Sequence, residues 1–315
     1  MGRCIVIERA NAVKLIITGA SGQYGRSAVT KLLERMDASD LVLITRTPAT
    51  LDEFAALGAD VRYGDYDKPE SLVSAFQGGD RMLLISGTRV GKRISQHAAA
   101  IDAAKVAGVK HIVYTSFIAL CKANPSVAVR DHLATESLLR DSGLDWTMLR
   151  DAHYADAMII NAGPNFIRSG QWASSSTPGR ETLVWRDDCV ACAVAVLTGE
   201  GHERQVYNIT GSELLTLREV CEQLAEVTGR TVNYIDTDDE GMYAIFDAMG
   251  IPREPVDDQV VAGISWNSDD MVTFEAAVRG GYFSVISDDV ELLLGRPPRS
   301  VREMIEANVE MLRNA

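Results

Sequence analysis

The sequence predicts an α/β fold in which a doubly wound parallel sheet carries a smaller C-terminal α/β lobe. Over residues 13–150, short apolar runs alternate regularly with helical patterns. Parallel neighbouring strands need crossover helices of this kind, and right-handed crossovers place helices on both faces of the sheet. In addition, the glycine-rich segment GASGQYG at 19–25 stands between the first apolar run and the first helix. Together these observations are typical of a Rossmann-type sheet.

Six segments of the first half are expected to be strands, because they are short apolar runs bounded by turn or helix signals. The first run carries few charges, as a strand buried on both faces should. The expected strands span 13–18, 41–45, 60–63, 81–85, 111–115 and 146–149.

Helices are expected between these strands, where apolar residues recur every three or four positions. Pro69 stands in the first turn of one helix, where its missing N–H costs nothing. The expected helices span 24–36, 50–57, 69–76, 91–107 and 129–141. Three of them end at a glycine, which readily adopts the left-handed conformation of a helix C-terminus. These glycines are Gly58, Gly108 and Gly143.

The pattern changes after Arg150, which predicts a second structural unit. The Rossmann domain is expected to span 13–150, and residues 151–315 to form mainly a substrate-binding lobe. Segments near 183–210 are expected to return to the Rossmann domain. In open α/β sheets ligands bind at the carboxyl ends of the strands, so the lobe should lie across that edge.

Composition and periodicity predict the elements of this second half. The stretch 169–182 is rich in Ser, Gly and Pro, which indicates loop and hairpin. A helix over 188–197 would have Asp187 or Asp188 as its N-cap. The other expected elements are a strand at 205–209, a threonine-capped helix at 216–228, a small helical lobe within 236–266 and final helices over 288–313.

Bulk properties exclude several functional classes. The net charge of -13 disfavours nucleic-acid binding, because phosphate contacts need a clustered basic surface. No apolar run reaches the ~20 residues that span a bilayer, and residues 1–12 resemble an extension rather than a signal peptide. The five scattered cysteines fit a reducing cytoplasm better than a disulfide framework. We expect a cytoplasmic monomer or homodimer that binds neither nucleic acid nor membrane.

The glycine turn predicts a bound dinucleotide. Its spacing is G-x-x-G-x-x-G, in which glycines permit a tight turn and let the backbone approach a pyrophosphate closely. The following helix N-terminus adds free N–H donors and a partial positive charge. A merely structural turn is the alternative. The residues expected to hold the pyrophosphate are Gly19, Ala20, Ser21, Gly22, Gln23 and Tyr24.

The end of the second strand favours NADP over NAD. An acidic residue there would bind the ribose 2′-hydroxyl, but this chain has Arg46 in Thr45-Arg46-Thr47-Pro48. An arginine can pair with a 2′-phosphate and stack on adenine, whereas the alternative is a solvated surface arginine. Asp65, after the third strand, would lie near the adenine edge or serve as a turn aspartate.

Several blocks resemble the NmrA-like atypical short-chain dehydrogenases. They are GASGQYG, TRTP, GDYDKPESL, LLISGTRVGKR, GVKHIVYTS, HLATESLLRDSGLDWTMLR and the terminal LLGRPPRSV. Within that family the chain is most similar to the NADPH-dependent quinone oxidoreductase and triphenylmethane reductase subgroup, from Val13 onward. The resemblance implies an NADPH-binding Rossmann domain, a small C-terminal lobe and a cleft between them. An NADPH-dependent reductase of quinone-like or other conjugated aromatic or carbonyl acceptors is therefore expected.

Two further loops complete the expected cofactor site. After the fourth strand, Ser86, Gly87, Thr88 and Arg89 should run beneath the ribose and the pyrophosphate. After the fifth strand, Thr115-Ser116-Phe117 matches the family's position for the catalytic-domain serine. Ser116 would hold the acceptor oxygen or cap backbone groups at the strand end.

The catalytic acid is not given by the usual motif. A short-chain reductase commonly uses Tyr-x-x-x-Lys on a helix, but the corresponding stretch here runs Asp131-His132-Leu133-Ala134-Thr135-Glu136. His132 falls where related phenylcoumaran and isoflavone reductases place a catalytic lysine, and a histidine can donate a proton near pH 7. The alternative is a helix-surface histidine paired with Glu136, four residues away on the same face.

The loop after the sixth strand departs from the subgroup. It reads Arg150-Asp151-Ala152-His153-Tyr154, where the quinone oxidoreductases usually have Arg-Asn-Gly-Trp-Tyr. Asp151 would border the nicotinamide with a potential negative charge. His153 is a second candidate proton donor, and Tyr154 would be an apolar wall or a hydrogen-bond donor. These departures indicate a different or more polar acceptor.

Two alternatives remain open at the level of function. Founding members of the family are redox-responsive regulators, so a non-catalytic NADP(H) sensor is the alternative to the reductase. The Cys189-x-x-Cys192 motif is of the kind that binds metal or carries out redox chemistry. However, it lies in an alanine-rich helix without a second ligand pair at zinc-like spacing. Buried helical cysteines are the better account, and we expect no metal site.

Overall fold

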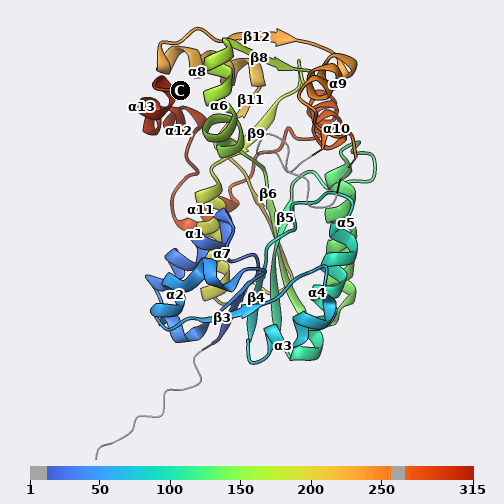
Figure 1. Ribbon diagram of the computed structural model, residues 1–315, viewed down its shortest axis with the longest axis vertical. Coiled ribbons are helices and arrows are strands. Elements are labelled where there is room, and N and C mark those ends of the chain that lie inside the picture. Colours follow the sequence, from blue (N-terminus) through green and yellow to red (C-terminus); the bar gives the residue numbers. More distant parts are fainter. Residues whose placement is uncertain (1–12, 255, 257–266) are drawn as a thin grey trace, which may run out of the picture.

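A seven-stranded parallel sheet forms the larger part of the computed structural model, which describes residues 13–254, 256 and 267–315. The strand order is β10-β6-β5-β4-β1-β2-β3, so the sheet is doubly wound as expected. Figure 1 shows this sheet in the lower half of the molecule, below the C-terminal lobe. Its strands are β1 (Leu15–Ile17), β2 (Leu41–Thr45), β3 (Asp60–Tyr63), β4 (Arg81–Leu84), β5 (His111–Phe117), β6 (Asp145–Asp151) and β10 (Gln205–Ile209).

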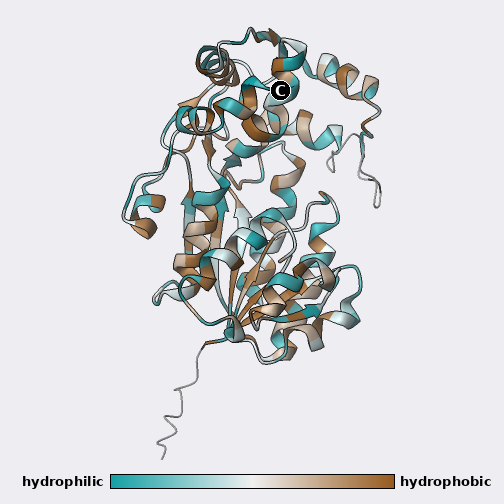
Figure 2. Ribbon diagram, turned by 60° about the vertical axis from the view of Figure 1, so that its left-hand side comes forward, coloured by the Kyte–Doolittle hydropathy of each residue, from teal (hydrophilic) through white to brown (hydrophobic). Residues whose placement is uncertain are grey.

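Side-chain alternation along the strands divides the core between the two faces of the sheet. Leu15 and Ile17 of β1 belong to one cluster of buried residues, whereas Ile16 between them belongs to the other. Successive residues of a strand point to opposite faces, so both must be apolar where helices cover both sides. This is why the strand sequences are continuous apolar runs, visible as brown strands in Figure 2.

Helices cover both faces. One face carries α1 (Gln23–Leu33), α7 (Arg186–Thr198) and α11 (Asp289–Leu294), and α7 contacts both of the others. The other carries α3 (Leu72–Phe76), α4 (Arg93–Ala107) and α5 (Val127–Asp141). The remaining helices of this half are α2 (Asp52–Ala56) and the 3₁₀ turns η1 (Ala38–Asp40), η2 (Pro48–Leu51) and η3 (Pro69–Ser71).

The C-terminal lobe contains two small sheets, one ordered β11-β9-β7 and one in which β12 pairs with β8. The strands are β7 (His153–Tyr154), β8 (Gln171–Ser174), β9 (Glu181–Val184), β11 (Leu214–Leu215) and β12 (Asn233–Asp236). The helices are the π-helix η4 (Ala157–Ala162), α6 (Gly163–Ser169), α8 (Leu217–Thr228), α9 (Asp239–Ala248), α10 (Ser268–Arg279), α12 (Val301–Ala307) and α13 (Val309–Arg313). A separate apolar cluster, which includes Trp172, Leu224 and Ile305, forms its core.

Most predicted elements are confirmed, including the strand 205–209, which joins the large sheet as β10. Thr216 caps α8 through a capping box with Glu219. The division into a domain over 13–150 and a lobe over 151–315 stays a prediction. The predicted N-terminal extension over 1–12 lies outside the described residues, as do residues 255 and 257–266 of the predicted helical lobe.

Two predictions about the second half are wrong. The stretch 169–182 does not form a hairpin, because β8 and β9 belong to different sheets with different partners. The helix predicted over 188–197 begins earlier and has Trp185 rather than Asp187 or Asp188 at its N-cap. Both aspartates instead lie in the first turn, where their charge is favourable and their carboxylates reach other segments.

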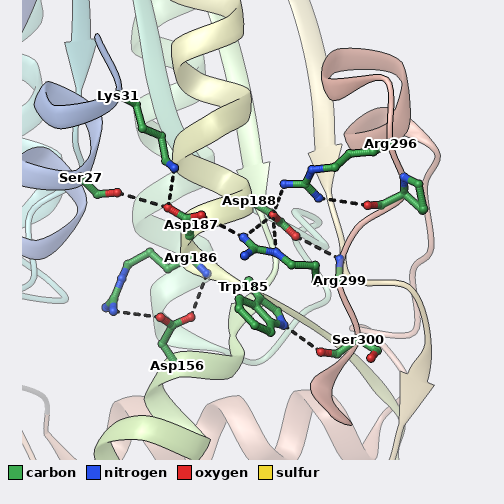
Figure 3. A network of polar contacts seen from close by, with 11 residues as sticks. Ser27, Lys31, Asp156, Trp185, Arg186, Asp187, Asp188, Arg296, Arg299 and Ser300 are labelled. Atoms are coloured by element: carbon green, nitrogen blue, oxygen red, sulfur yellow. Dashed lines mark hydrogen bonds and ion pairs between the residues drawn. The ribbon is translucent and has the colours of Figure 1, made fainter. Parts of the chain in front are cut away.

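Asp188 is the centre of a polar network that ties the C-terminal segment to the large sheet (Figure 3). Its fully buried carboxylate accepts hydrogen bonds from Arg296 Nη2 (2.6 Å) and from Arg299 Nη2 (2.6 Å) and N–H (3.1 Å). Arg299 also pairs with Asp187, which pairs with Lys31 of α1. Burial acts to raise the pKa of Asp188, but the two arginines outweigh it and hold that pKa below its usual range. The terminal LLGRPPRSV block is therefore a structural clamp.

Replacing Asp188 by asparagine should destabilise the protein by about 3 kcal/mol at pH 7, since it leaves two arginines without their buried partner. Because the pKa of Asp188 is lowered on folding, its contribution is complete above about pH 4, the unfolded-state value. It is lost as the pH falls from there through the folded-state pKa. Urea denaturation across pH measures both effects.

The exposed pair Arg204–Asp145 offers a matched control. Arg204→Gln should change the unfolding free energy by less than about 0.5 kcal/mol, because solvent screens an exposed pair. Equal effects of Asp188→Asn and Arg204→Gln at pH 7 would contradict a stabilising role for the clamp.

Candidate functional site

The glycine turn connects β1 to α1 at the carboxyl edge of the sheet. Gly19 has a φ of +58°, in the left-handed region that glycine adopts without strain. A Cβ on Gly25 would stand 2.4 Å from the carbonyl oxygen of Gly19, so only glycine lets α1 begin this close to the turn. Both glycines are thus needed for the turn to hold its shape.

A cavity of about 270 Å³ opens beside this turn. It is bounded by the loops that follow β1, β2, β3 and β4. Of the sequence-predicted cofactor residues, nine line it together: Gly19, Ser21, Gly22, Arg46, Asp65, Ser86, Gly87, Thr88 and Arg89. This first cavity therefore brings together segments from four separate loops, as the sequence predicts.

The remaining residues of the turn have other partners. Ala20 is fully buried. Gln23 Oε1 accepts a hydrogen bond from Arg186 Nη1 (2.6 Å), and Tyr24 OH donates to the Cys189 carbonyl oxygen (3.1 Å). The Gln23 and Tyr24 side chains thus fix α1 against α7, which is a positioning role that the sequence did not indicate. Cofactor contact by these three side chains stays a prediction.

Charged groups mark the outer end of the first cavity. Arg46 is exposed there, at the end of β2. Asp65 Oδ1 accepts the Asp67 N–H (3.0 Å), which is the turn role that the sequence left open. Asp67 in turn pairs with Arg89 and accepts from Gln96 Nε2 (2.8 Å). Burial acts to raise the pKa of Asp67, but Gln96 and Arg89 outweigh it and lower that pKa.

A second cavity of about 210 Å³ adjoins the first, and Ser86 lines both. Strands β5 and β6 supply its floor, β7 one wall, and α5 and α10 the other walls. Its polar lining residues are Ser86, Arg93, Thr115, Ser116, His132, Asp151, His153, Tyr154 and Asp270. All three predicted catalytic residues and Asp151 are therefore brought together, one cavity away from the glycine turn.

His132 is a buried group rather than a surface one. Its Nδ1 lies 2.7 Å from Tyr114 OH, and the Phe117 and Tyr114 rings are packed against it. Burial, with smaller contributions from Arg93 and His97, lowers the pKa of His132 well below its ordinary value. The imidazole is therefore neutral at physiological pH.

The alternative of a surface His132 paired with Glu136 is wrong. Both side chains are buried, and Glu136 accepts hydrogen bonds from Arg150 Nε (2.8 Å), Arg150 Nη2 (2.7 Å) and Ser116 Oγ (2.8 Å). Burial acts to raise the pKa of Glu136, but Arg150 and Ser116 outweigh it and lower that pKa. Glu136 thus fixes the ends of β5 and β6 and holds the Ser116 hydroxyl.

Asp151 and Tyr154 form a second buried pair. Tyr154 OH donates to Asp151 Oδ2 (2.7 Å), while Oδ1 is buried without a hydrogen-bond partner in the described part of the chain. Burial raises the pKa of Asp151 to about 7. Burial and the nearby Asp151 charge also raise the pKa of Tyr154 well above its ordinary value. The carboxyl group is therefore partly protonated near neutral pH, so the potential negative charge expected from the sequence is only partly present there.

His153 is held between a carboxylate and an aromatic ring. Its Nδ1 lies 3.1 Å from Glu181 Oε2 of β9, and the ring stands edge-on to Phe274 of α10, with centroids 4.7 Å apart. The His153 side chain retains 17% exposure, whereas that of Glu181 has 1%. Parallel pairing of β7 with β9 sets this geometry.

Several residues of the second cavity were missed by sequence reasoning. Arg93 is the last residue of the LLISGTRVGKR block, and its Nε donates a hydrogen bond to the Gly87 carbonyl oxygen (2.6 Å). Asp270 and Phe274 come from α10, a helix that was not predicted. Its Asn267 cap was the available signal, since the Asn267 side chain accepts the Asp270 N–H (3.0 Å). Glu181 carried no signal, because its role depends on strand pairing.

Comparison with known proteins agrees with this geometry. The model of an NAD(P)H-binding family matches residues 19–199, which is more than half of the chain. Quinone oxidoreductase 2 of Escherichia coli K12 is 33% identical over 92% of this chain and 97% of its own length. The chain belongs to the NAD(P)H-binding, NmrA-like oxidoreductases. Its family and its oxidoreductase class are thereby confirmed.

Solved structures confirm the fold of this NmrA-like oxidoreductase. An E. coli NADPH-dependent quinone oxidoreductase in complex with NADPH superposes with a TM-score of 0.84, at 31% identity over 93% of this chain and 99% of that one. Triphenylmethane reductase from Citrobacter sp. in complex with NADP(H) gives 0.82, at 31% identity over 95% and 99%. An NAD(P)H azoreductase from Xenophilus azovorans is 28% identical over 93% of this chain and 97% of its own length.

The described residues were found to hold neither a metal cluster nor a membrane-spanning helix. Among residues 13–254, 256 and 267–315, no group of three or more His, Cys, Asp or Glu side chains could hold a metal ion. Cys189 and Cys192 are buried in α7 of the oxidoreductase, and burial raises the pKa of both thiols. Within the same described ranges, no helix is long and apolar enough to cross a membrane.

The Asp151 carboxyl predicts a pH-dependent stability difference. Because the pKa of Asp151 is raised to about 7 on folding, wild-type stability falls as the pH rises from about 4 through 7. Asp151→Asn removes this titration. Relative to wild type, the variant should gain roughly 2–3 kcal/mol between pH 5 and pH 8 in urea denaturation. A difference that does not vary with pH would contradict the proposed protonation.

Proposed function

We propose that this NmrA-like oxidoreductase is an NADPH-dependent reductase that transfers hydride to a quinone-like or other conjugated aromatic acceptor. The observation that carries the proposal is the junction of two cavities at Ser86, one beside the glycine turn and one lined by candidate acid groups. Its relatives include a quinone oxidoreductase, an azoreductase and a triphenylmethane reductase, which supports this acceptor class.

The first cavity fits the adenosine and pyrophosphate half of the cofactor. Gly19 and Gly22 expose backbone, and the α1 N-terminus supplies N–H groups and a partial positive charge for the pyrophosphate. Arg46 would pair with the 2′-phosphate, in agreement with relatives whose structures contain NADPH or NADP(H). When bound, the cofactor supplies hydride from its nicotinamide.

The second cavity fits a flat acceptor next to the nicotinamide. Phe117 and Phe274 give it apolar walls, which exclude water and hold an aromatic ring close to the hydride donor. Ser116 lines this cavity as well, and its hydroxyl proton is donated to Glu136 (2.8 Å). The chain's departures Asp151 and His153 make this cavity more polar than an apolar quinone alone requires.

An NADP(H)-sensing regulator without hydride transfer is the alternative function. Both functions use the first cavity in the same way, so only the second cavity distinguishes them. Six ionisable side chains line it together with aromatic walls, which a sensor does not need. This convergence favours the enzyme. The expectations of cytoplasmic location and of a monomer or homodimer stay predictions.

Purified protein should oxidise NADPH only when an acceptor is present. Loss of the reduced-nicotinamide absorbance with menadione, methyl red or malachite green measures this turnover directly. The control is the same mixture without acceptor. Tight NADPH binding without acceptor-dependent oxidation across quinones, dyes and enones would instead support the sensor.

Arg46→Asp should weaken NADPH binding by about 10- to 100-fold and leave NADH binding nearly unchanged, because only NADPH carries the 2′-phosphate. Fluorescence titration of each cofactor measures both affinities. Arg35→Asp, at an exposed site after α1, is the matched charge reversal. Equal losses for NADPH and NADH in Arg46→Asp would refute the 2′-phosphate role.

A further inference from the structure

The three candidate proton donors for the proposed reduction, His132, His153 and Tyr154, have different surroundings. His132 is neutral, buried and hydrogen-bonded to Tyr114, so it has no proton to give as an imidazolium. Tyr154 already donates its hydroxyl proton to Asp151, and its raised pKa makes it a weak acid. Of the three, His153 combines partial exposure with a carboxylate partner.

The contact between His153 and Glu181 fixes the imidazole. Glu181 Oε2 lies 3.1 Å from Nδ1, so the carboxylate accepts the Nδ1–H and leaves Nε2 as the nitrogen available to the cavity. The Phe274 ring, at 4.7 Å, restricts rotation of the imidazole. A buried carboxylate that orients a histidine in this way also stabilises its charged form.

We propose that His153 and Glu181 form a proton-delivery dyad for the acceptor bound in the second cavity. His153 is the catalytic acid, and Glu181 is a positioning residue that acts through it. This inference rests on the proposed reductase function. It extends that function by naming the acceptors that benefit: those whose reduction leaves a strongly basic anion, such as an azo nitrogen or a carbonyl oxygen.

Hydride from the dihydronicotinamide forms a bond to the acceptor, which takes the electron pair and becomes an anion while the cofactor is oxidised. The Nε2–H bond of protonated His153 breaks, and its proton forms a bond to the anionic atom of the acceptor. His153 is left neutral and keeps its Nδ1–H on Glu181. Water in the partly open cavity then returns a proton to Nε2.

Other charged groups face this dyad from three elements. Asp270 of α10 lies near enough to interact electrostatically with His153 and Arg93, and its burial raises its pKa. Asp151 of β6 and Arg93 of α4 line the same cavity. Behind Glu181, Glu275 of α10 is buried, which raises its pKa, and the Glu181 charge raises it further. Among the carboxyl groups named here, that of Glu181 lies within hydrogen-bonding distance of the His153 ring.

The dyad distinguishes acceptors by the basicity of their products. Reduction of a quinone leaves a phenolate-like oxygen that solvent can protonate after hydride transfer. Reduction of an azo bond leaves a nitrogen anion that needs a proton as it forms. General acid catalysis contributes typically 10²–10⁴-fold where such a proton is required. The benefit of His153 should therefore be large for azo compounds and small for quinones.

The decisive experiment compares His153→Gln with wild type on methyl red and on menadione. We expect kcat for methyl red to fall about 100-fold or more, kcat for menadione to fall less than about 10-fold, and NADPH affinity to stay unchanged. His202→Gln is the matched control, since His202 bonds Tyr207 (2.9 Å) away from both cavities. Thermal denaturation checks that each variant folds.

Glu181→Gln tests the positioning role separately. It should lower kcat for methyl red about 10-fold with KM unchanged and move the alkaline limb of its pH profile to lower pH. Nitrogen-15 spectra of the five histidines should show the His153 Nδ1–H resonance in wild type and its shift in Glu181→Gln. A merely structural Glu181 would change stability but neither the pH profile nor this resonance.

The possible outcomes distinguish failure of the dyad from failure of the proposed reductase function. A methyl red loss below about 3-fold in His153→Gln, with wild type active, would overturn the dyad and leave the reductase proposal intact. Equal losses for both acceptors would also overturn it, because acceptor basicity would then not matter. Wild type that oxidises NADPH with neither acceptor would overturn the reductase proposal and the dyad together.

Discussion

The parallel direction of all seven strands is the constraint on which the rest of the molecule depends. Every strand of the large sheet ends at the same edge, so four successive loops converge there to enclose the first cavity. Strands β5 and β6 are longer than β1 and β4, and their last residues, Ser116, Phe117 and Asp151, line the second cavity. The second cavity exists because these two strands continue. The direction and length of the strands thus determine where the two cavities lie, and the side chains determine what lines them.

Buried charges support this geometry on both sides of the sheet. Glu136 holds Arg150 and Ser116, which fixes the ends of β6 and β5 relative to α5. Asp188 does the same for α7 and the C-terminal segment. In both cases arginines lower the pKa of a buried carboxylate and keep it ionised. Asp151, which faces the second cavity, instead accepts a hydrogen bond from Tyr154, and burial raises the pKa of its carboxyl to about 7.

Local sequence patterns were enough to predict much of the fold. The residues that form the walls of the second cavity could be identified only from the tertiary structure. Strand β10 was predicted to the residue, at Gln205–Ile209. The nine predicted residues that line the first cavity could be identified from the sequence because each lies in a loop that follows a predicted strand. The hairpin at 169–182 failed, since strand partners are chosen by distant segments such as β12. For the same reason Glu181 could not be linked to His153, 28 residues away, before the β7–β9 pairing was known.

The clamp at Asp188 also bears on how the chain is completed during synthesis. Arg296 and Arg299 follow Asp188 by more than a hundred residues, and Trp185 Nε1 donates to the Ser300 carbonyl oxygen (2.8 Å) from the same helix. A nascent chain that has already formed α7 must therefore keep this face of the helix hydrated until residues 296–300 have left the ribosome. The Rossmann half, although first to be made, acquires its finished surface last.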